Sequence, residues 1–125
     1  MKHCLVVDDS RVVRKVACQI LETFSFETEE APDGATALHA CRTRMPDVIL
    51  LDAQMPDMTG AEFLRSLRRD KKGKDPVVVF CTIENDPTQI GEALSAGANE
   101  YVMKPFDRDS LAAALAEAGL LGERQ

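Results

Sequence analysis

The stretch from Asp47 to Gly60 constrains the fold more than any other part of the chain. It contains Val-Ile-Leu-Leu at residues 48–51, an apolar run with no polar residue to mark a solvent-facing side. Such a run, followed by Asp52 and then by Pro56, is typical of a strand buried on both faces of a parallel sheet. Ligands in open α/β sheets gather beyond the carboxyl ends of the strands. Asp52 therefore stands where chemistry is expected, and its charge requires a metal, a cation or water beside it.

Strand-like and helix-like segments alternate along the chain. Apolar residues at steps of three and four, which indicate amphipathic helices, follow each short strand-like segment. This alternation predicts an α/β fold, a doubly wound five-stranded parallel sheet with five helices. The expected strands are residues 4–7, 26–31, 48–52, 76–81 and 100–103.

The helices are expected to begin at capping residues and to bury one apolar face. The candidate N-caps are Asp9 or Ser10, Asp33, Asp86 before a proline, and Asp107. Gly97 is placed to end the fourth helix. The predicted inward faces, in chain order, are Val13, Val16, Ala17, Ile20, Leu21 and Phe24; Ala37, Leu38 and Cys41; Phe63, Leu64 and Leu67; Ile90, Ala93 and Leu94; Leu111, Leu115 and Ala118.

Size and composition limit the classes of function. A chain of 125 residues falls in the range of one domain, which we expect at residues 1–121 with a short tail at 122–125. A net charge of −6 argues against a general nucleic-acid or membrane binder. The sequence has no signal-peptide pattern and no apolar run of transmembrane length, so we expect a cytoplasmic protein. Its four cysteines form no Cys-x-x-Cys pair, which favours small buried hydrophobes over disulfides or zinc ligands.

Polar side chains follow the expected strands and should meet at one edge of the sheet. They are Asp8 and Asp9 after the first strand, Asp52 after the third, Thr82 after the fourth and Lys104 after the fifth. Three carboxylates packed together repel unless a cation neutralises them, and all-oxygen ligation suits Mg²⁺. A lysine and a hydroxyl can hold phosphoryl oxygens, and a carboxylate can act as the nucleophile that takes up a phosphoryl group.

These residues, with Met55-Pro56, Gly60, Tyr101 and Lys104-Pro105, resemble the receiver domain of two-component response regulators over essentially the whole chain. The resemblance implies a flavodoxin-like fold with strand order 2-1-3-4-5. Because we find no second module after it, the chain is similar to the stand-alone, chemotaxis-regulator type.

The resemblance also implies the site. It assigns Asp52 as the phosphoacceptor and gives Mg²⁺ the ligands Asp9, Asp52 and the backbone carbonyl of Gln54, with Asp8 acting mainly through water. Thr82 would bond one phosphoryl oxygen and Lys104 would pair with another, next to a Lys104–Pro105 peptide that is typically cis. The donor would be a phosphohistidine on a sensor histidine kinase or a phosphotransfer protein. The chain would catalyse only its own phosphorylation and dephosphorylation, and would signal to an unknown protein target.

Further roles follow from the same resemblance. Thr82 and Tyr101 would form the switch; the alternative for Tyr101 is a partly buried sheet tyrosine with no switching role. Gln54, Ile83 and Glu84 would tune access and phosphoryl lifetime. The output surface would include Tyr101, Met103 and Phe106, although the last two could equally be core residues.

Several alternatives stay open at this point. A pseudo-receiver would keep the fold and bind partners without phosphorylation. A haloacid dehalogenase-type phosphatase would need Asp-x-Asp-x-Thr, whereas the chain reads Asp8-Asp9-Ser10-Arg11. The basic residues between Arg65 and Lys74 would either bind an acidic partner or a nucleotide, or simply be a solvated helix end. The same two possibilities hold for Arg11, Arg14 and Lys15, which could steer a kinase.

Overall fold

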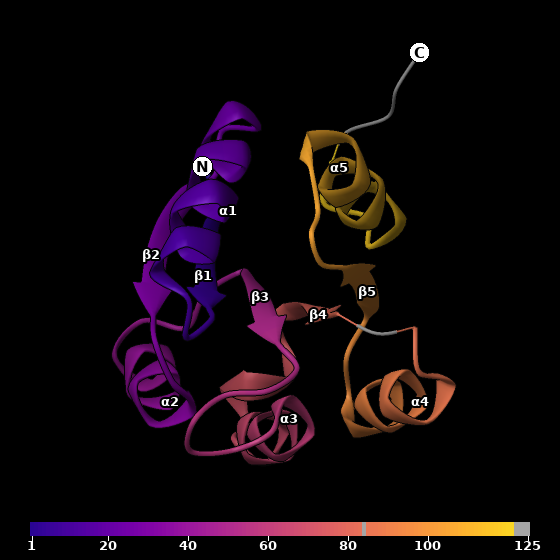
Figure 1. Ribbon diagram of the computed structural model, residues 1–125. Helices are drawn as coiled ribbons and strands as arrows, with labels where there is room; N and C mark the ends of the chain where they lie inside the picture. Colours follow the sequence, from indigo (N-terminus) through magenta and orange to yellow (C-terminus); the bar gives the residue numbers. More distant parts are fainter. Residues whose placement is uncertain (84, 122–125) are drawn as a thin grey trace.

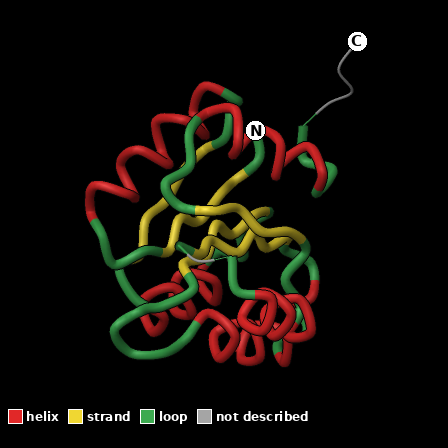
Figure 2. The backbone as a smooth tube through the Cα atoms, turned by 45° about the vertical axis from the view of Figure 1, so that its right-hand side comes forward, coloured by secondary structure: helices red, strands yellow, loops and turns green. Residues whose placement is uncertain are grey.

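The computed structural model describes residues 1–83 and 85–121, and its strands lie between two layers of helices (Figures 1 and 2). The predicted tail at 122–125 lies outside the described residues, so the domain limit stays a prediction. The elements in chain order are β1 (His3–Val7), α1 (Arg11–Thr23), β2 (Glu27–Ala31), α2 (Gly34–Thr43), β3 (Val48–Asp52), α3 (Gly60–Arg69), the 3-10 helix η1 (Lys72–Lys74), β4 (Val77–Thr82), α4 (Pro87–Ala96), β5 (Glu100–Met103) and α5 (Arg108–Glu117).

The strands form one parallel sheet in the order β2-β1-β3-β4-β5, which confirms the predicted topology. The register pairs Val7 with Leu51, Asp52 with Cys81, and Thr82 with Met103. The last residues of these strands therefore lie side by side at one edge. The polar residues that follow them are brought to the same place.

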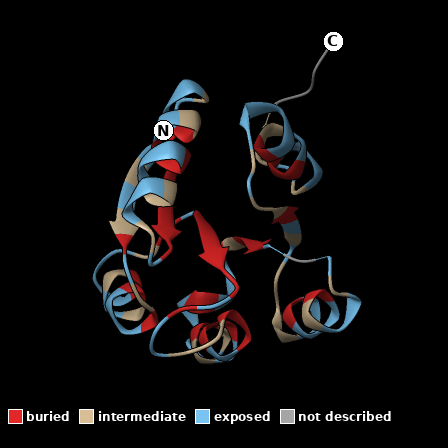
Figure 3. Ribbon diagram, viewed as in Figure 1, coloured by how far each residue is buried: buried red, intermediate tan, exposed pale blue. Residues whose placement is uncertain are grey.

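The sheet is buried on both sides because successive strand residues point to opposite faces. Leu5 and Ile49 pack in the core beneath α2, α3 and α4, whereas Val6 and Leu50 pack in the core beneath α1 and α5. β1, β3 and β4 are the buried centre of the molecule, and the helices expose only their outer sides (Figure 3). All four cysteines lie within the described residues and are free and buried, as expected.

Local capping matches the sequence. Asp33, Asp86 and Asp107 each accept a hydrogen bond from a backbone amide in the first turn of the helix they precede. Ser10, rather than Asp9, caps α1 by accepting from the amide of Val13. Gly97 ends α4 at a φ of 118°, a conformation that favours glycine. Since Ser10 provides the cap, the carboxylate of Asp9 is not needed to cap α1.

The prediction of a buried side chain is wrong for two residues. Val16 is 41% exposed and Leu94 is 44% exposed. On α1 the buried stripe is the narrower set Ala17, Cys18 and Leu21, and Val16 lies beside it. On α4 the side chains of Ile90 and Ala93 are buried, whereas that of Leu94 is left exposed. A three-and-four spacing predicts a wide apolar stripe, but the neighbouring elements decide how much of it is covered.

The basic segment from Arg65 to Lys74 is only partly solvated. It includes the short helix η1, and Arg68 is half-buried rather than solvated. The Arg68 guanidinium donates to the carbonyl oxygens of Gly97, Gly73 and Pro76, at 2.7–3.3 Å. Arg68 therefore ties the loop to the end of α4. Among the described residues, no helix is long enough and apolar enough to cross a membrane.

The start of α3 leaves no room for a side chain at Gly60. A β-carbon there would lie 2.7 Å from a ring carbon of Phe80 and 2.9 Å from the carbonyl oxygen of Asp52. We expect Gly60→Ala to destabilise the fold by about 1–3 kcal/mol, because the core must shift to admit the methyl group. Thermal unfolding measures this. Gly91→Ala in α4 is the matched control, since its β-carbon meets nothing within 4 Å, and it should raise the melting temperature slightly. Equal effects of the two substitutions would contradict the packing argument.

Candidate metal centre at the carboxyl edge of the sheet

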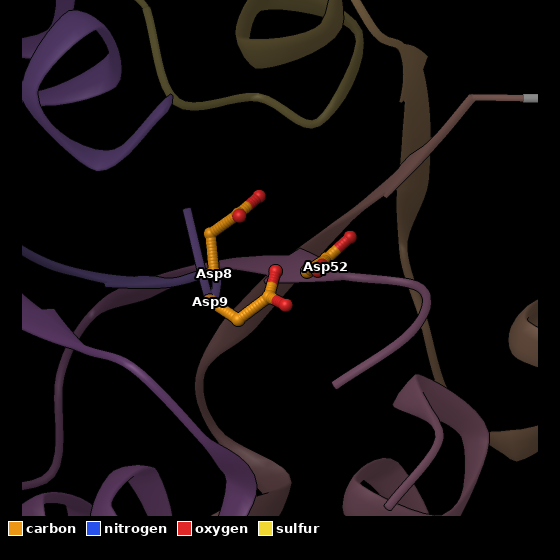
Figure 4. Close-up of side chains that lie close together, drawn as sticks. All are labelled: Asp8, Asp9 and Asp52. Carbon is orange, nitrogen blue, oxygen red and sulfur yellow. The ribbon is translucent and has the colours of Figure 1, made fainter. Parts of the chain in front are cut away.

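Three carboxylates converge where β1 and β3 end. One oxygen from each of Asp8, Asp9 and Asp52 lies within 4.8 Å of the others. Figure 4 shows the side chains of Asp8 and Asp9 just after β1, close to Asp52 at the end of β3, with the Asp9 carboxylate reaching toward Asp52. Asp8 and Asp52 are buried, whereas Asp9 is exposed. The geometry therefore gathers the acidic residues that the sequence predicted.

Lys104 bridges the two buried acids. Its Nζ donates to Asp8 Oδ2 and to Asp52 Oδ1, each at 3.0 Å. Burial, assisted by the charge of Asp8, raises the pKa of Asp52. Burial opposes the ammonium form of Lys104, but hydrogen bonds to Asp8 and Asp52 raise the pKa of Lys104 above its ordinary value. With three carboxylates and one ammonium, the cluster keeps an excess of two negative charges, which suits a divalent cation bound by oxygen.

The two acids of β1 have different surroundings. Asp8 Oδ1 accepts from the amide of Ser10 at 2.8 Å, so both of its carboxylate oxygens are engaged once Lys104 is counted. Its carbonyl oxygen accepts from Arg14 at 2.7 Å. Asp9 lines an open cleft instead. Asp9 is thus the better placed of the two to contact a cation directly.

The cleft above Asp52 has a volume of about 340 Å³. Its walls are Asp9, Asp52, Ala53, Gln54, Thr82, Ile83, Gln89 and Lys104. The buried Thr82 hydroxyl donates to Gln89 Oε1 at 2.8 Å. Gln89 was missed in the sequence, because a glutamine in the first turns of a helix carries no signal that it faces a site.

The loop after Asp52 is closed by backbone hydrogen bonds. Met55 N donates to Met58 O at 3.2 Å, and Gly60 N donates to Ala53 O at 2.8 Å. This closure holds Gln54 at the rim of the cleft. At the next edge loop, the Lys104–Pro105 peptide is cis, as the resemblance implies.

Comparison with known proteins agrees with this geometry. A family model for the response regulator receiver domain matches residues 4–116. The chain belongs to the receiver domain family of response regulators. The structure of the chemotaxis response regulator CheY4 of Vibrio cholerae superposes with a TM-score of 0.89 and 33% identity, covering 94% of this chain and 98% of that one. The acidic cluster of this receiver domain fits the Mg²⁺ site of the family.

Curated relatives of the receiver domain differ in length. The chemotaxis protein CheY of Pseudomonas aeruginosa is 41% identical over 103 residues, covering 82% of this chain and 83% of CheY. The regulatory protein AtoC of Escherichia coli is 39% identical over 111 residues, covering 89% of this chain but 24% of AtoC. The receiver domain therefore spans most of CheY and about a quarter of AtoC.

The remaining predicted residues that the structure describes lie at the rim of the cleft or outside it. Ile83 is 71% exposed at the rim, and Glu84 lies outside the described residues. Tyr101 is exposed and lines a shallow pocket beside α5 together with Met103. Phe106 is half-buried and lines a different groove, next to α1. The three residues predicted for an output surface therefore do not share one pocket.

An apolar groove of about 440 Å³ adjoins the candidate metal centre of the receiver domain. It is lined by Val12, Val13, Val16, Ile83, Lys104, Pro105 and Phe106. Val12 is 72% exposed, so the groove includes large apolar side chains in contact with solvent. The nearby cations Arg14 and Lys15, predicted either to steer a kinase or to be solvated, both pair with Glu30 on β2.

Proposed function

We propose that this receiver domain accepts a phosphoryl group on Asp52 from a phosphohistidine, carried by a sensor histidine kinase or a phosphotransfer protein. In this proposal the protein works in the cytoplasm and alters its binding to a protein target, with no role in binding nucleic acid or membrane. The observation that carries it is the bridge of Lys104 to both Asp8 and Asp52 beside the exposed Asp9. That arrangement supports the proposal, because it gathers three carboxylates and one ammonium at a single edge of the sheet.

Asp52 is the nucleophile in this reaction. The Asp52 oxygen that does not accept from Lys104 attacks the phosphorus while the bond from phosphorus to the histidine nitrogen breaks, and the imidazole leaves with the electron pair. Asp9, Asp52 and the carbonyl of Gln54 would hold Mg²⁺, and Asp8, with both carboxylate oxygens engaged, would act through water. When bound, Mg²⁺ offsets the negative charge of the acids against the incoming phosphoryl group.

Lys104 and Thr82 exchange partners during the reaction. Lys104 turns its ammonium from the carboxylates to a phosphoryl oxygen, and Thr82 turns its hydroxyl from Gln89 to another. Water later attacks the acyl phosphate and releases phosphate. The protein thus catalyses steps on its own Asp52 and turns over no separate substrate. Gln54, Ile83 and Glu84 would set the lifetime of the phosphoryl group.

The phosphodonor protein would dock on the apolar groove beside the cleft. The position of the groove supports this docking site, because Lys104 and Ile83 line both the groove and the cleft that holds Asp52. Movement of Thr82 would vacate space for Tyr101, whose exposed ring would turn inward. Met103 shares the pocket of Tyr101 and would belong to the same output surface. A Tyr101 that keeps its position in both states remains the alternative.

Titration with beryllofluoride, a phosphoryl mimic, tests the proposal. We expect saturable binding that requires Mg²⁺ and shifts the amide NMR signals of Asp52, Thr82 and Lys104, because these residues surround the phosphoryl position. Omission of Mg²⁺ is the control. Absence of binding would support a pseudo-receiver that acts without phosphorylation. Transfer of radiolabelled phosphate from a panel of histidine kinases would then identify the donor.

A further inference from the structure

A half-buried arginine outside the cleft contacts the turn that carries Asp8 and Asp9. Arg14 lies in α1, and its side chain is only 14% exposed. One terminal nitrogen of its guanidinium donates to the carbonyl oxygen of Asp8 at 2.7 Å. Its Nε donates to Glu30 Oε1 on β2 at 2.9 Å. A single side chain thus connects the β1–α1 turn to the edge strand of the sheet.

The chemistry of these contacts requires an arginine. The carbonyl of Asp8 lies just beyond β1, and a buried carbonyl needs a donor. The guanidinium offers rigid donors in different directions, whereas a lysine has one small ammonium. Glu30 stays ionised near neutral pH, since hydrogen bonds from Lys15 and Arg14 hold its pKa below the ordinary value. The ion pair between Arg14 and Glu30 therefore persists at neutral pH.

The amide, the carboxylate and the carbonyl of Asp8 all form hydrogen bonds. Its amide donates to the carbonyl of Ala31 on β2 at 3.1 Å, and its carboxylate is engaged by the Ser10 amide and Lys104. Arg14 supplies the remaining contact, to the carbonyl. This carbonyl carbon belongs to the peptide that leads into Asp9. The direction of the Asp9 side chain therefore depends on it.

We propose that Arg14 is a positioning residue for the metal centre, which fixes the peptide between Asp8 and Asp9 by tying it to Glu30. The inference rests on the proposed function, because it assumes that these acids bind Mg²⁺. Metal ligands depend on neighbours that orient them, and loss of such a neighbour typically costs about 10- to 100-fold in metal affinity.

The direction in which Mg²⁺ affinity changes when Arg14 is removed separates a positioning role from a purely electrostatic one. Arg14 is a cation near an acidic site, so its removal should strengthen Mg²⁺ binding if only electrostatics matters. If Arg14 positions the turn, its removal weakens binding instead. Lys15→Met is the matched control, because Lys15 pairs with the other oxygen of Glu30 at 3.0 Å and is itself exposed. Both substitutions remove one positive charge, but only Arg14 contacts the turn.

The experiment is calorimetric titration of the full chain with Mg²⁺ alone. We expect Arg14→Met to weaken binding by about 10-fold or more, Lys15→Met to leave it unchanged or tighter, and Arg14→Lys to restore it only in part. In the metal-free protein, the Ser10 amide, which donates to Asp8, should exchange with solvent faster in Arg14→Met than in Lys15→Met. Measurement well below the melting temperature separates this effect from unfolding.

The Mg²⁺ affinities of the wild type and of Arg14→Met test the positioning role and the proposed function separately. If the wild type binds Mg²⁺ and Arg14→Met binds it equally or more tightly, the positioning role is wrong and the proposed function stands. If the wild type itself binds no Mg²⁺, both the positioning role of Arg14 and the proposed function are wrong. Should Arg14→Met fail to fold, Glu30→Gln takes its place, since the neutral amide weakens the anchor of Arg14 without touching Asp8. Unchanged Mg²⁺ affinity in Glu30→Gln would then overturn the inference.

Discussion

The Asp52→Asn variant is expected to stay folded while retaining no phosphoryl group from the cognate kinase. Radiolabel held by the protein should fall at least about 1,000-fold, because the amide cannot serve as the covalent nucleophile. The fold should persist, since asparagine has nearly the same shape. Burial already disfavours the charge of Asp52 and raises its pKa. Labelled phosphate on the denatured protein and thermal unfolding measure the two parts of this prediction.

Asp57→Asn is the matched control for this experiment. Asp57 lies in the loop that follows Asp52 and accepts hydrogen bonds from the amides of Gly34 and Ala35, each at 2.9 Å. It is exposed and does not line the cleft. The control should therefore be labelled like the wild type. Normal labelling of Asp52→Asn would refute Asp52 as the phosphoacceptor.

Lys104→Met is expected to have the largest effect on stability. Two buried carboxylates would lose the cation that bridges them, and breaking such a pair typically costs about 3–5 kcal/mol. Mg²⁺ affinity should rise, because the competing ammonium is gone. Phosphorylation should no longer change the affinity for the protein target, because the phosphoryl group loses the residue that responds to it. Thermal unfolding, Mg²⁺ titration and target binding measure these three effects.

The loss of stability in Lys104→Met should depend on pH. The carboxyl of Asp52 has a pKa above its ordinary value, so its ionisation costs stability as the pH rises through that pKa. Removal of Lys104 raises the pKa further, so the deficit should be largest at neutral pH and shrink toward acid pH. Lys15→Met, which breaks an exposed pair, should cost under about 1 kcal/mol. A deficit of the same size at all pH values would show that Lys104 does not neutralise the buried acids.

Much of the site follows from local sequence patterns. The apolar run before Asp52 predicts a doubly buried strand, and alternation of strands and helices predicts a parallel sheet. Together they place the residues that follow each strand at one edge, where Asp8, Asp9, Asp52, Thr82 and Lys104 do lie. These predictions depend only on period, on strand ends and on capping, which are properties of short segments.

Contacts between distant segments were decided only by the tertiary structure. The sequence indicated neither that Arg14 would bridge Asp8 and Glu30 nor that Gln89 would hold the Thr82 hydroxyl. It also predicted Val16 as buried, although the elements around α1 leave it in an open groove. The physical reason is the same in each case. A pattern along one segment determines which residues share a face, whereas the partner of a side chain depends on how elements far apart in the chain pack together.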